Sequence, residues 1–382
     1  MNKYAQVTGG ADVHCRLLAG ALESRGHQIA YLATDIEHGI GDPACAVGGV
    51  VTHQNRDGLG GRAAARVAAT AFWNRTSASA TADLIRRFRP EVMHAHKLYP
   101  QLSVAPVVVA ARLGIPIVQT AHDYEFVAAS PTDHTGSKRD REESRASFRA
   151  LNTSLFAVKR FIHVPRVTRW VAVSRALADV YERRSLIPSV LPNFGIGNSA
   201  RVPTFDERRG VLFAGRLAEE KGVHHVVALA GLDGGPPVTV AGSGDLEPLV
   251  RGAQAECKLR YLGPISNEAV RGEMERARVV VMPSLCEDSG PLTAIEAMIS
   301  GTPVVAYRSG GLAEYVEDAR AGRVVEPGTE ALSAAVRALH DNEDLWREHS
   351  ANGRSAARTT HSPARYVESL EAVYAAAIEG RR

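Results

Sequence analysis

The segment Pro283–Met298 contains side chains whose types and spacing suit a phosphorylated ligand; its sequence is Pro-Ser-Leu-Cys-Glu-Asp-Ser-Gly-Pro-Leu-Thr-Ala-Ile-Glu-Ala-Met. It is typical of a strand end, an acidic loop with a glycine, and a helix that carries Glu296 near its start. Unpaired N–H groups at a helix N-terminus favour an anionic phosphate, and a carboxylate can accept hydrogen bonds from both ribose hydroxyls. The segment therefore indicates a nucleotide-sugar site; the alternative is an ordinary strand-to-helix turn with surface acids.

Two cations, Arg216 and Lys221, lie in a second loop that opens a helix. Their guanidinium and ammonium groups, together with the helix N–H groups, can converge on phosphate. Glycosyl transfer from a nucleotide sugar leaves a diphosphate, so negative charge grows on the leaving oxygen. Removing one group that stabilises such a charge typically costs about 3–4 kcal/mol.

The first half of the chain carries a group of histidines. His122 ends the apolar run 116–120 and is followed by Asp123; at the carboxyl end of a strand both side chains would enter a ligand crevice. His94 and His96 would point to one face of a strand, as two metal ligands could. No acid or further histidine accompanies that pair at a suitable spacing, so we expect no metal site and interpret the pair as structural or cleft-lining.

Gly9 and Gly10 precede a predicted helix. Because glycine has no Cβ, the backbone there can approach a ligand closely and adopt a positive φ. The alternative is a tight turn that needs glycine for packing. Asp12 and His14 fall on the first helical turn, where they either face an acceptor or lie on the surface.

Short apolar runs alternate with helical patterns along the whole chain. The predicted strands are 28–32, 92–94, 115–120, 170–173, 211–215, 238–242, 260–263, 279–283, 304–306 and 323–325. The predicted helices are 10–25, 62–89 (broken), 103–113, 175–181, 221–230, 246–254, 267–276, 292–300 and 330–339. This alternation predicts an α/β protein with parallel sheets, in which two Rossmann-like domains face a central cleft. The polar stretch 195–209 is the predicted linker.

The amino-acid composition narrows the range of possible functions. With 382 residues, 45% hydrophobic and 23% charged, the chain can bury two cores, and its net charge of +3 gives no case for a nucleic-acid partner. Its four cysteines have no CxxC or Cys/His spacing, which predicts reduced thiols in a cytoplasmic protein; they are Cys15, Cys45, Cys257 and Cys286. Neither a signal peptide nor an apolar run of membrane-spanning length is present.

Two regions break the alternating pattern. The polar, charged stretch 130–147 is a predicted mobile loop, either a solvated insertion or a lid over the acceptor. Only Met1–Thr8 precede Gly9, so either Tyr4–Val7 forms a minimal strand or the true start lies upstream.

Several short motifs follow one another in order. In the first half they are Gly9-Gly10-Ala11-Asp12, His94-Ala95-His96, Thr120-Ala121-His122-Asp123, Val173-Ser174-Arg175 and Leu191-Pro192-Asn193-Phe194-Gly195. In the second half they are Phe213-Ala214-Gly215-Arg216-Leu217, Glu220-Lys221-Gly222, Ala241-Gly242-Ser243-Gly244, Tyr261-Leu262-Gly263 and Gly310-Gly311-Leu312-Ala313-Glu314. Together they resemble glycosyltransferase family 4, the retaining two-domain transferases of the GT-B fold, over essentially the whole chain.

The resemblance implies a donor site in which Arg216 and Lys221 take the place of a metal. It also implies that the Gly10 amide lies beside the donor phosphate and that His122 hydrogen-bonds the transferred sugar. Membrane-associated members of the family use a basic amphipathic helix in the first domain. The arginines of 62–75 are sparse, so we expect a packed helix there and a soluble acceptor, with membrane association left open.

The acidic motif departs from the family pattern. The family carries two acids separated by seven residues; here that spacing joins Asp288 to Glu296, and Glu287 lies one residue further away. The segment 289–291, Ser-Gly-Pro, replaces Pro-Phe-Gly. Either Glu287 contacts the sugar through a one-residue bulge or Asp288 takes that role, and we favour Glu287.

These considerations assign three groups of residues. The predicted catalytic residues are His122, Arg216, Lys221 and Glu287. The predicted donor-binding residues are Gly9, Gly10, Gly215, Gly242, Asp288, Ser289, Gly290, Pro291, Leu292 and Glu296. The predicted acceptor-binding residues are Asp12, His14, His96 and Asp123. No cofactor or metal is expected, because the nucleotide-diphosphate sugar is itself the donor substrate.

The sequence thus predicts a retaining, metal-independent glycosyltransferase that moves a sugar, most simply from a UDP-sugar, to a hydroxyl of a small soluble or glycan acceptor. The alternatives are a nucleotide-sugar epimerase or a sugar phosphorylase of the same fold, and a non-catalytic sugar-nucleotide-binding protein. The predicted domains are 1–197 for the acceptor and 198–365 for the donor, with 366–382 crossing back as a helix. The oligomeric state is left open.

Overall fold

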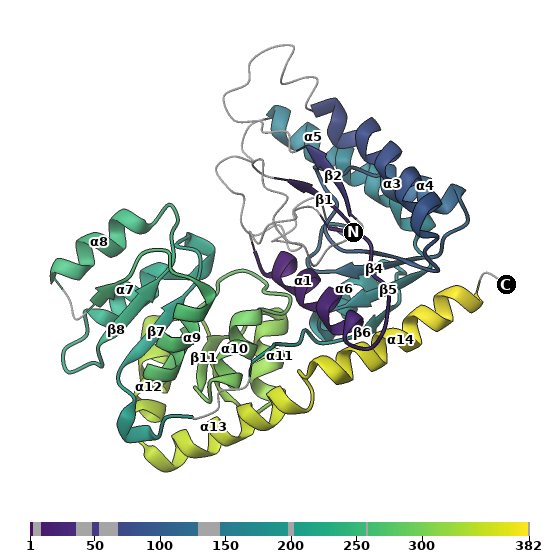
Figure 1. Cartoon of the computed structure of the whole chain (residues 1–382). Helices are drawn as coiled ribbons and strands as arrows, with labels where there is room; N and C mark the ends of the chain where they lie inside the picture. Colours follow the sequence, from purple (N-terminus) through teal and green to yellow (C-terminus); the bar gives the residue numbers. More distant parts are fainter. Residues whose placement is uncertain are drawn as a thin grey trace. The chain divides into compact units, whose positions relative to one another are not determined.

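The computed structural model describes residues 1–2, 9–35, 48–52, 68–128, 146–197, 202–256 and 259–380. The chain forms two compact units (Figure 1). The N-terminal unit comprises Met1–Leu191 together with Tyr366–Arg382, and the C-terminal unit comprises Pro192–Arg365.

The C-terminal unit is built on a six-stranded parallel sheet in the order β12-β11-β10-β7-β8-β9. Its strands are β7 (Val211–Ala214), β8 (Val238–Ala241), β9 (Leu259–Tyr261), β10 (Val279–Met282), β11 (Val304–Tyr307) and β12 (Gly322–Val325). Its α-helices are α7 (Val223–Ala230), α8 (Glu247–Glu256), α9 (Asn267–Arg276), α10 (Leu292–Ile299), α11 (Gly310–Asp318), α12 (Thr329–His340) and α13 (Glu343–Arg358). Valine dominates the central strands because helices cover both faces of such a sheet.

The strand order of this sheet reverses once. From β7 the chain adds β8 and β9 on one side, then returns to add β10, β11 and β12 on the other. In a doubly wound sheet ligands bind at the carboxyl ends of the strands that flank such a reversal. The loops after β7 and β10 therefore occupy the expected ligand position of the C-terminal unit.

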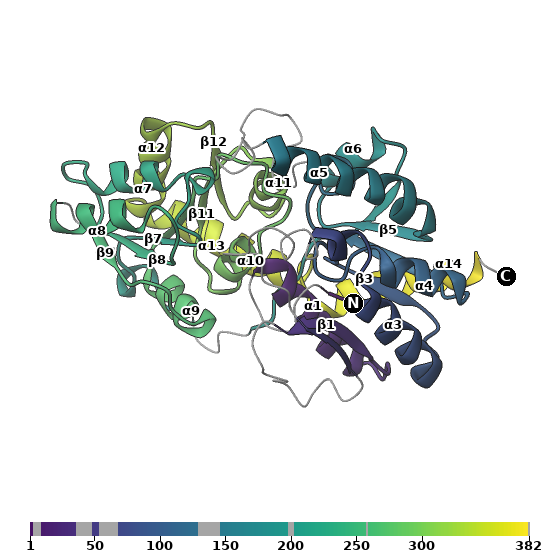
Figure 2. The same cartoon turned by 90° about the horizontal axis from the view of Figure 1, so that it is seen from above.

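The N-terminal unit contains a two-stranded and a four-stranded parallel sheet, in the orders β1-β2 and β3-β4-β5-β6. The strands are β1 (Tyr31–Asp35), β2 (Gly48–Thr52), β3 (Met93–Ala95), β4 (Ile117–Ala121), β5 (Arg169–Ala172) and β6 (Pro188–Val190). The described part of 1–191 includes the α-helices α1 (Gly10–Glu23), α3 (Arg75–Phe88), α4 (Ala105–Arg112), α5 (Ala146–Val158) and α6 (Arg175–Glu182). Helices α3 and α4 lie side by side (Figure 2).

The first two residues lie between these two sheets. The Asn2 amide donates to the Leu32 carbonyl at 3.1 Å, and the Met1 carbonyl accepts from the His96 amide at 2.9 Å. Backbone bonds on both sides therefore connect β1 with the segment that follows β3. The predicted minimal strand Tyr4–Val7 lies outside the described residues.

The last helix, α14 (Pro363–Glu379), packs on the N-terminal unit. Tyr374 Oη lies 2.7 Å from His94 Nδ1. Glu371 pairs with Arg25 through contacts of 3.0 and 2.7 Å. The apolar side of this helix, which includes Leu370, is buried.

The α/β class with parallel sheets is as predicted, but several elements differ. Strand β1 begins at Tyr31 rather than Gln28 and includes the polar Thr34 and Asp35. Strands β2 and β6 were missed because one begins with two glycines and the other with proline, both typical of turns. Helices α5, α11 and α13 were also missed; α13 buries only Trp346, Ser350 and Gly353, so it has little apolar periodicity. Most of the predicted loop 130–147 lies outside the described residues.

The predicted linker was wrong at its C-terminal end. Phe205 is buried, and the Arg208 side chain is fully enclosed in the C-terminal unit. The guanidinium group donates to five oxygens: the carbonyls of Pro203, Met274, Ala277 and Ser300 and the hydroxyl of Thr302. Ala277 and Ser300 cap the C-termini of α9 and α10, where backbone carbonyls lack helical partners. Arg208 is thus a core residue of the C-terminal unit.

No helix in the described parts of the chain has both the length and the apolar character needed to cross a bilayer. Cys15 and Cys286 are free thiols, whereas Cys45 and Cys257 lie outside the described residues.

A buried histidine gives the N-terminal unit a predictable pH dependence. His163 is fully buried, with Nε2 3.0 Å from Gln119 Oε1 and Nδ1 3.2 Å from Tyr99 Oη. Burial, assisted by the charges of Lys159 and Arg166, lowers the pKa of His163 to about 3. The unfolded chain therefore binds this proton more readily, and the contribution of neutral His163 is complete above pH 6.5 and lost as pH falls toward 3.

We predict that lowering the pH from 7 to 5 costs the N-terminal unit about 2 kcal/mol through His163 alone. In denaturant titrations at the two pH values, His163→Gln is expected to reduce the pH-dependent loss by that amount. Equal pH dependence in wild type and His163→Gln would show that His163 is not held neutral.

Candidate active site

Two loops of the C-terminal unit meet at the reversal of the strand order. The Leu285 amide, after β10, donates to the Glu220 carbonyl, after β7, at 2.8 Å. Gly222 has a φ of 69°, and a Cβ there would lie 2.0 Å from the Pro283 carbonyl oxygen. Glycine is therefore required at 222, and the short 3₁₀ turn Glu219–Lys221 is held against the loop after β10.

Lys221 and Asp288 form an ion pair across this junction. Lys221 Nζ lies 2.7 and 2.8 Å from the two carboxylate oxygens of Asp288, and Ser284 Oγ donates to the same carboxylate at 2.5 Å. Burial disfavours the charged ammonium, but the charge and hydrogen bonds of Asp288 outweigh it, so the pKa of Lys221 is raised. Lys221 is thus a fixed cation at the expected ligand position.

Arg216 lies in the same loop as Lys221 but is more exposed. Its guanidinium pairs with Glu220 at 2.6 Å, and 62% of the side chain is accessible to solvent. An exposed pair of this kind contributes at most about 1 kcal/mol. A bound anion such as a diphosphate could therefore replace Glu220 as the partner of Arg216 at little cost in free energy.

The structure gives different surroundings to Glu287 and Asp288, the two acids between which the sequence left a choice. Asp288 is committed to Lys221, whereas no hydrogen bond or ion pair of Glu287 occurs within the described residues. A Cβ added at Gly310 would lie 2.8 Å from Glu287 Oε2, so this carboxylate lies at the N-terminus of α11. Glu287 as the sugar-contacting acid stays a prediction, and this geometry favours it.

The rest of the predicted donor set lies around the same strand ends. Pro291 precedes α10 as its N-cap without a side-chain cap bond, and the Gly290 carbonyl accepts from Asn193 Nδ2 at 2.7 Å. Burial raises the pKa of Glu296, one turn into α10, although Arg271 opposes the shift. Ser289 and Leu292 lie beside these residues in the chain.

The loops after β7 and β8 are also in contact. Gly242 has a φ of 136°, and a Cβ there would lie 1.9 Å from the Gly215 carbonyl oxygen. Gly242 therefore needs to be glycine for packing alone, so its presence is no independent sign of a ligand.

Gly9 and Gly10 behave differently from what their sequence suggested. Gly9 has an extended φ of −170°, and Gly10 has no positive φ. A Cβ at either position would meet no atom of the described residues within 4 Å. Neither a positive φ nor packing within the described residues requires glycine here, and the close approach of a ligand stays a prediction.

Three predicted site residues of the N-terminal unit converge. His96 Nδ1 lies 3.0 Å from His122 Nε2, and the ring centroid of His14 lies 5.7 Å from that of His96 and 5.2 Å from that of His122. Burial lowers the pKa of all three imidazoles, to about 3 for His122. All three side chains are therefore neutral at pH 7.

The surface alternative for Asp12 and His14 was wrong, because both are buried. Asp12 Oδ1 accepts from Asn2 Nδ2 at 2.7 Å. His94 and His96 lie on one side of the chain as expected, with ring centroids 4.3 Å apart and ring planes tilted by 31°. His94 instead contacts Tyr374 Oη and Thr120 Oγ1, each at 2.7 Å.

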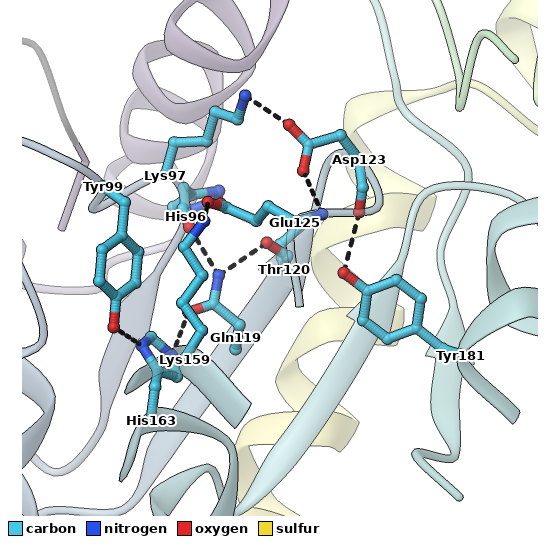
Figure 3. Close-up of polar contacts among 10 residues, drawn as sticks. All are labelled: His96, Lys97, Tyr99, Gln119, Thr120, Asp123, Glu125, Lys159, His163 and Tyr181. Atoms are coloured by element: carbon cyan, nitrogen blue, oxygen red, sulfur yellow. Dashed lines mark hydrogen bonds and ion pairs between the residues drawn. The ribbon is translucent and has the colours of Figure 1, made fainter. Parts of the chain in front are cut away.

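A polar network follows β3 and β4 (Figure 3). Asp123 forms an ion pair with Lys97 and accepts from the Glu125 amide at 2.9 Å, so it caps the following turn. Glu125 in turn pairs with Lys159 at 2.7 Å. Sequence reasoning missed the two lysines. Lys97 could have been found because it directly follows His96, a predicted site residue, whereas no motif in the sequence points to Lys159.

Comparisons with known proteins identify the family. The sequence pattern described as Glycosyltransferase Family 4 matches residues 8–194, and the pattern described as Glycosyl transferases group 1 matches residues 198–357. The chain therefore belongs to the group 1, family 4 glycosyltransferases, as its motifs predicted.

Individual relatives agree with this assignment. The chain is 28% identical over 316 residues to the glycogen synthase of Mycobacterium tuberculosis strain CDC 1551 / Oshkosh, which covers 78% of this chain and 71% of the relative. Its fold is similar to that of sucrose-phosphate synthase from Thermosynechococcus elongatus, with a TM-score of 0.71, 18% identity and coverage of 98% and 94% of the two chains. Anabaena HepE, solved in complex with UDP and glucose, gives a TM-score of 0.66 at 16% identity, with coverage of 97% and 98%. These likenesses confirm the predicted GT-B fold.

The adjacent acids 287 and 288 allow a matched test of the ion pair. We predict that Asp288→Asn lowers the free energy of unfolding of the C-terminal unit by about 1–3 kcal/mol at pH 7, because it leaves the largely buried Lys221 without its counter-ion. Glu287→Gln is expected to change that free energy by less than about 0.5 kcal/mol. The two variants would be compared by denaturant titration. Equal stabilities would show that the pairing with Lys221 contributes nothing.

Proposed function

We propose that this chain is a retaining, metal-independent hexosyltransferase that moves a sugar from a nucleotide-diphosphate sugar to a hydroxyl of a small soluble or glycan acceptor. The observation that carries the proposal is the position of Lys221. It lies at the reversal of the strand order of the C-terminal unit, paired across two loops with Asp288. A fixed cation at this position suits a ligand with a diphosphate.

In the proposed reaction the bond between the anomeric carbon and the leaving diphosphate oxygen breaks. The acceptor oxygen bonds to the same face of that carbon, and its proton passes to the leaving phosphate oxygen. Lys221 and Arg216 stabilise the charge that grows on the diphosphate. Glu296 accepts the ribose hydroxyls, and Glu287 accepts hydroxyls of the sugar.

The protonation state of His122 restricts its role. With a pKa of about 3, its imidazole is neutral at pH 7. A neutral ring offers one donor and one acceptor nitrogen. We therefore assign His122 to a hydrogen bond with the transferred sugar, with its electron pair near the positive charge that develops at the anomeric carbon.

Uridine is the first base to test. The similar fold of HepE has been solved with UDP and glucose, although its 16% identity supports the fold rather than the ligand. The acceptor would be identified by screening a panel of sugars, cyclitols and glycans for transfer. Proton NMR of the product reads the anomeric configuration directly, and retention is expected. A donor that changes without any acceptor would instead identify an epimerase.

Two arginines of the C-terminal unit provide a matched test of the donor site. Arg216 pairs with Glu220 and Arg251 with Glu247, both four residues apart, and the two side chains are 62% and 63% exposed. We predict that Arg216→Ala weakens UDP binding about 10-fold or more by removing a charge-assisted contact, whereas Arg251→Ala leaves it unchanged. Calorimetric titration with and without EDTA measures both effects, and EDTA is expected to have none. Equal affinities of the two variants would contradict the phosphate role of Arg216.

Two glycines of α1 test the approach of a ligand to the N-terminal unit. Neither Gly10 nor Gly20 has an atom of the described residues within 4 Å of an added Cβ. Alanine is a better helix former, so both Gly10→Ala and Gly20→Ala are expected to preserve or slightly raise the melting temperature. We predict that only Gly10→Ala lowers sugar transfer, by about 10-fold or more, because a loss of about 1.4 kcal/mol already gives that factor. Full activity of Gly10→Ala would argue against a ligand at this turn.

A further inference from the structure

Three histidines from separate elements bring ligating nitrogens together in the N-terminal unit. His14 lies in α1, His96 follows β3 and His122 follows β4. One nitrogen of each lies within 4.8 Å of the corresponding nitrogens of the other two. His14 and His96 are buried, and His122 is half-buried. From this convergence we propose that His14, His96 and His122 form a binding site for one divalent transition-metal ion.

The distances fit such an ion. Zinc binds imidazole nitrogen at about 2.0–2.1 Å in tetrahedral geometry, so two ligand nitrogens lie about 3.4 Å apart. The separation of His96 Nδ1 from His122 Nε2 is 3.0 Å, and all separations within the trio stay below 4.8 Å. These separations therefore bracket the value of about 3.4 Å that a tetrahedral ion requires.

The surroundings of the rings also suit metal ligation. Metal ions bind the neutral form of imidazole, and His14 and His96 are buried. The ring nitrogen of a ligand that faces away from the ion is usually hydrogen-bonded, which orients the ring. Tyr366 Oη lies 3.2 Å from His14 Nε2 and supplies a contact of this kind from α14.

The ligand set selects among metals. Three imidazoles suit Zn²⁺, Co²⁺, Ni²⁺ and Cu²⁺, whereas Mg²⁺ and Ca²⁺ prefer oxygen ligands. The trio contains no carboxylate. A site with three protein ligands keeps one position of a tetrahedral ion open to water. The site is therefore expected to discriminate sharply against Mg²⁺.

The proposed ion is an inhibitor rather than a cofactor, and this part rests on the proposed function. The nitrogen of His122 that faces His96 cannot bind an ion and a sugar hydroxyl at once. Donor binding by Lys221 and Arg216 uses residues of the other unit. Occupancy of the histidine site is therefore expected to reduce transfer while UDP affinity stays unchanged.

The experiment is a titration of tag-free, metal-stripped protein with Co²⁺, whose visible absorption reports tetrahedral nitrogen ligation. One equivalent is expected to bind, and Zn²⁺ but not Mg²⁺ is expected to displace it. His14→Gln and His122→Gln are expected to abolish the absorption, and Tyr366→Phe to weaken the affinity about 10-fold. His27→Gln, a partly exposed histidine of the same unit, is the matched control and is expected to bind like wild type.

Circular dichroism establishes which variants fold, and either folded glutamine variant of the trio is sufficient for the comparison. A wild-type protein without a saturable Co²⁺ spectrum would overturn the site. So would an unchanged spectrum in His14→Gln or His122→Gln. Full sugar transfer with the site saturated would overturn its inhibitory role. Titration with UDP in metal-free buffer tests the donor site separately, so failure of one proposal is distinguishable from failure of the other.

Discussion

The candidate site in the C-terminal unit of this glycosyltransferase depends on one constraint, the reversal of strand order between β7 and β10. Parallel strands bring all their carboxyl ends to one edge of the sheet, and right-handed crossovers send the chain to opposite faces on the two sides of a reversal. The loops after β7 and β10 therefore leave neighbouring strand ends at the same edge of the sheet, where the Leu285 amide donates to the Glu220 carbonyl. Lys221 comes from one loop and Asp288 from the other, so a single topological feature brings together residues that are 67 positions apart.

The pair formed by Lys221 and Asp288 also explains how a charged lysine is stabilised in a largely buried position when no ligand is bound. Transfer of an ammonium group from water into protein is costly unless an acid accompanies it. In the proposed complex a phosphate oxygen would compete with this carboxylate for Lys221. Binding of a diphosphate would then exchange one anion for another, which is less costly than burying a new charge.

Sequence reasoning found what depends on local pattern and missed what depends on spatial neighbours. The valine-rich strands of the C-terminal unit and the helix starting at Leu292 follow from apolar runs, glycines and proline, so their bounds are nearly those predicted. Strand β2 was missed because its glycines indicate a turn. The commitment of Asp288 to Lys221, and the convergence of His14 with His96 and His122, were beyond its reach because neither is encoded in spacing. Arg208 shows the same limit: a polar stretch predicted a linker, but five oxygens from elsewhere in the unit receive its guanidinium.

The docking of α14 sets an order in which the two units can be completed during synthesis. Tyr366, Val367 and Leu370 are buried in the N-terminal unit, although the whole C-terminal unit lies between them and Leu191 in the chain. The contiguous stretch Pro192–Arg365 can therefore finish folding as soon as it leaves the ribosome. The unit that is synthesised first must wait for the last helix, and until then it exposes the apolar surface that α14 will cover. Such surface attracts chaperones and other unfinished chains, so the N-terminal unit is exposed to misassembly for longer than the C-terminal unit.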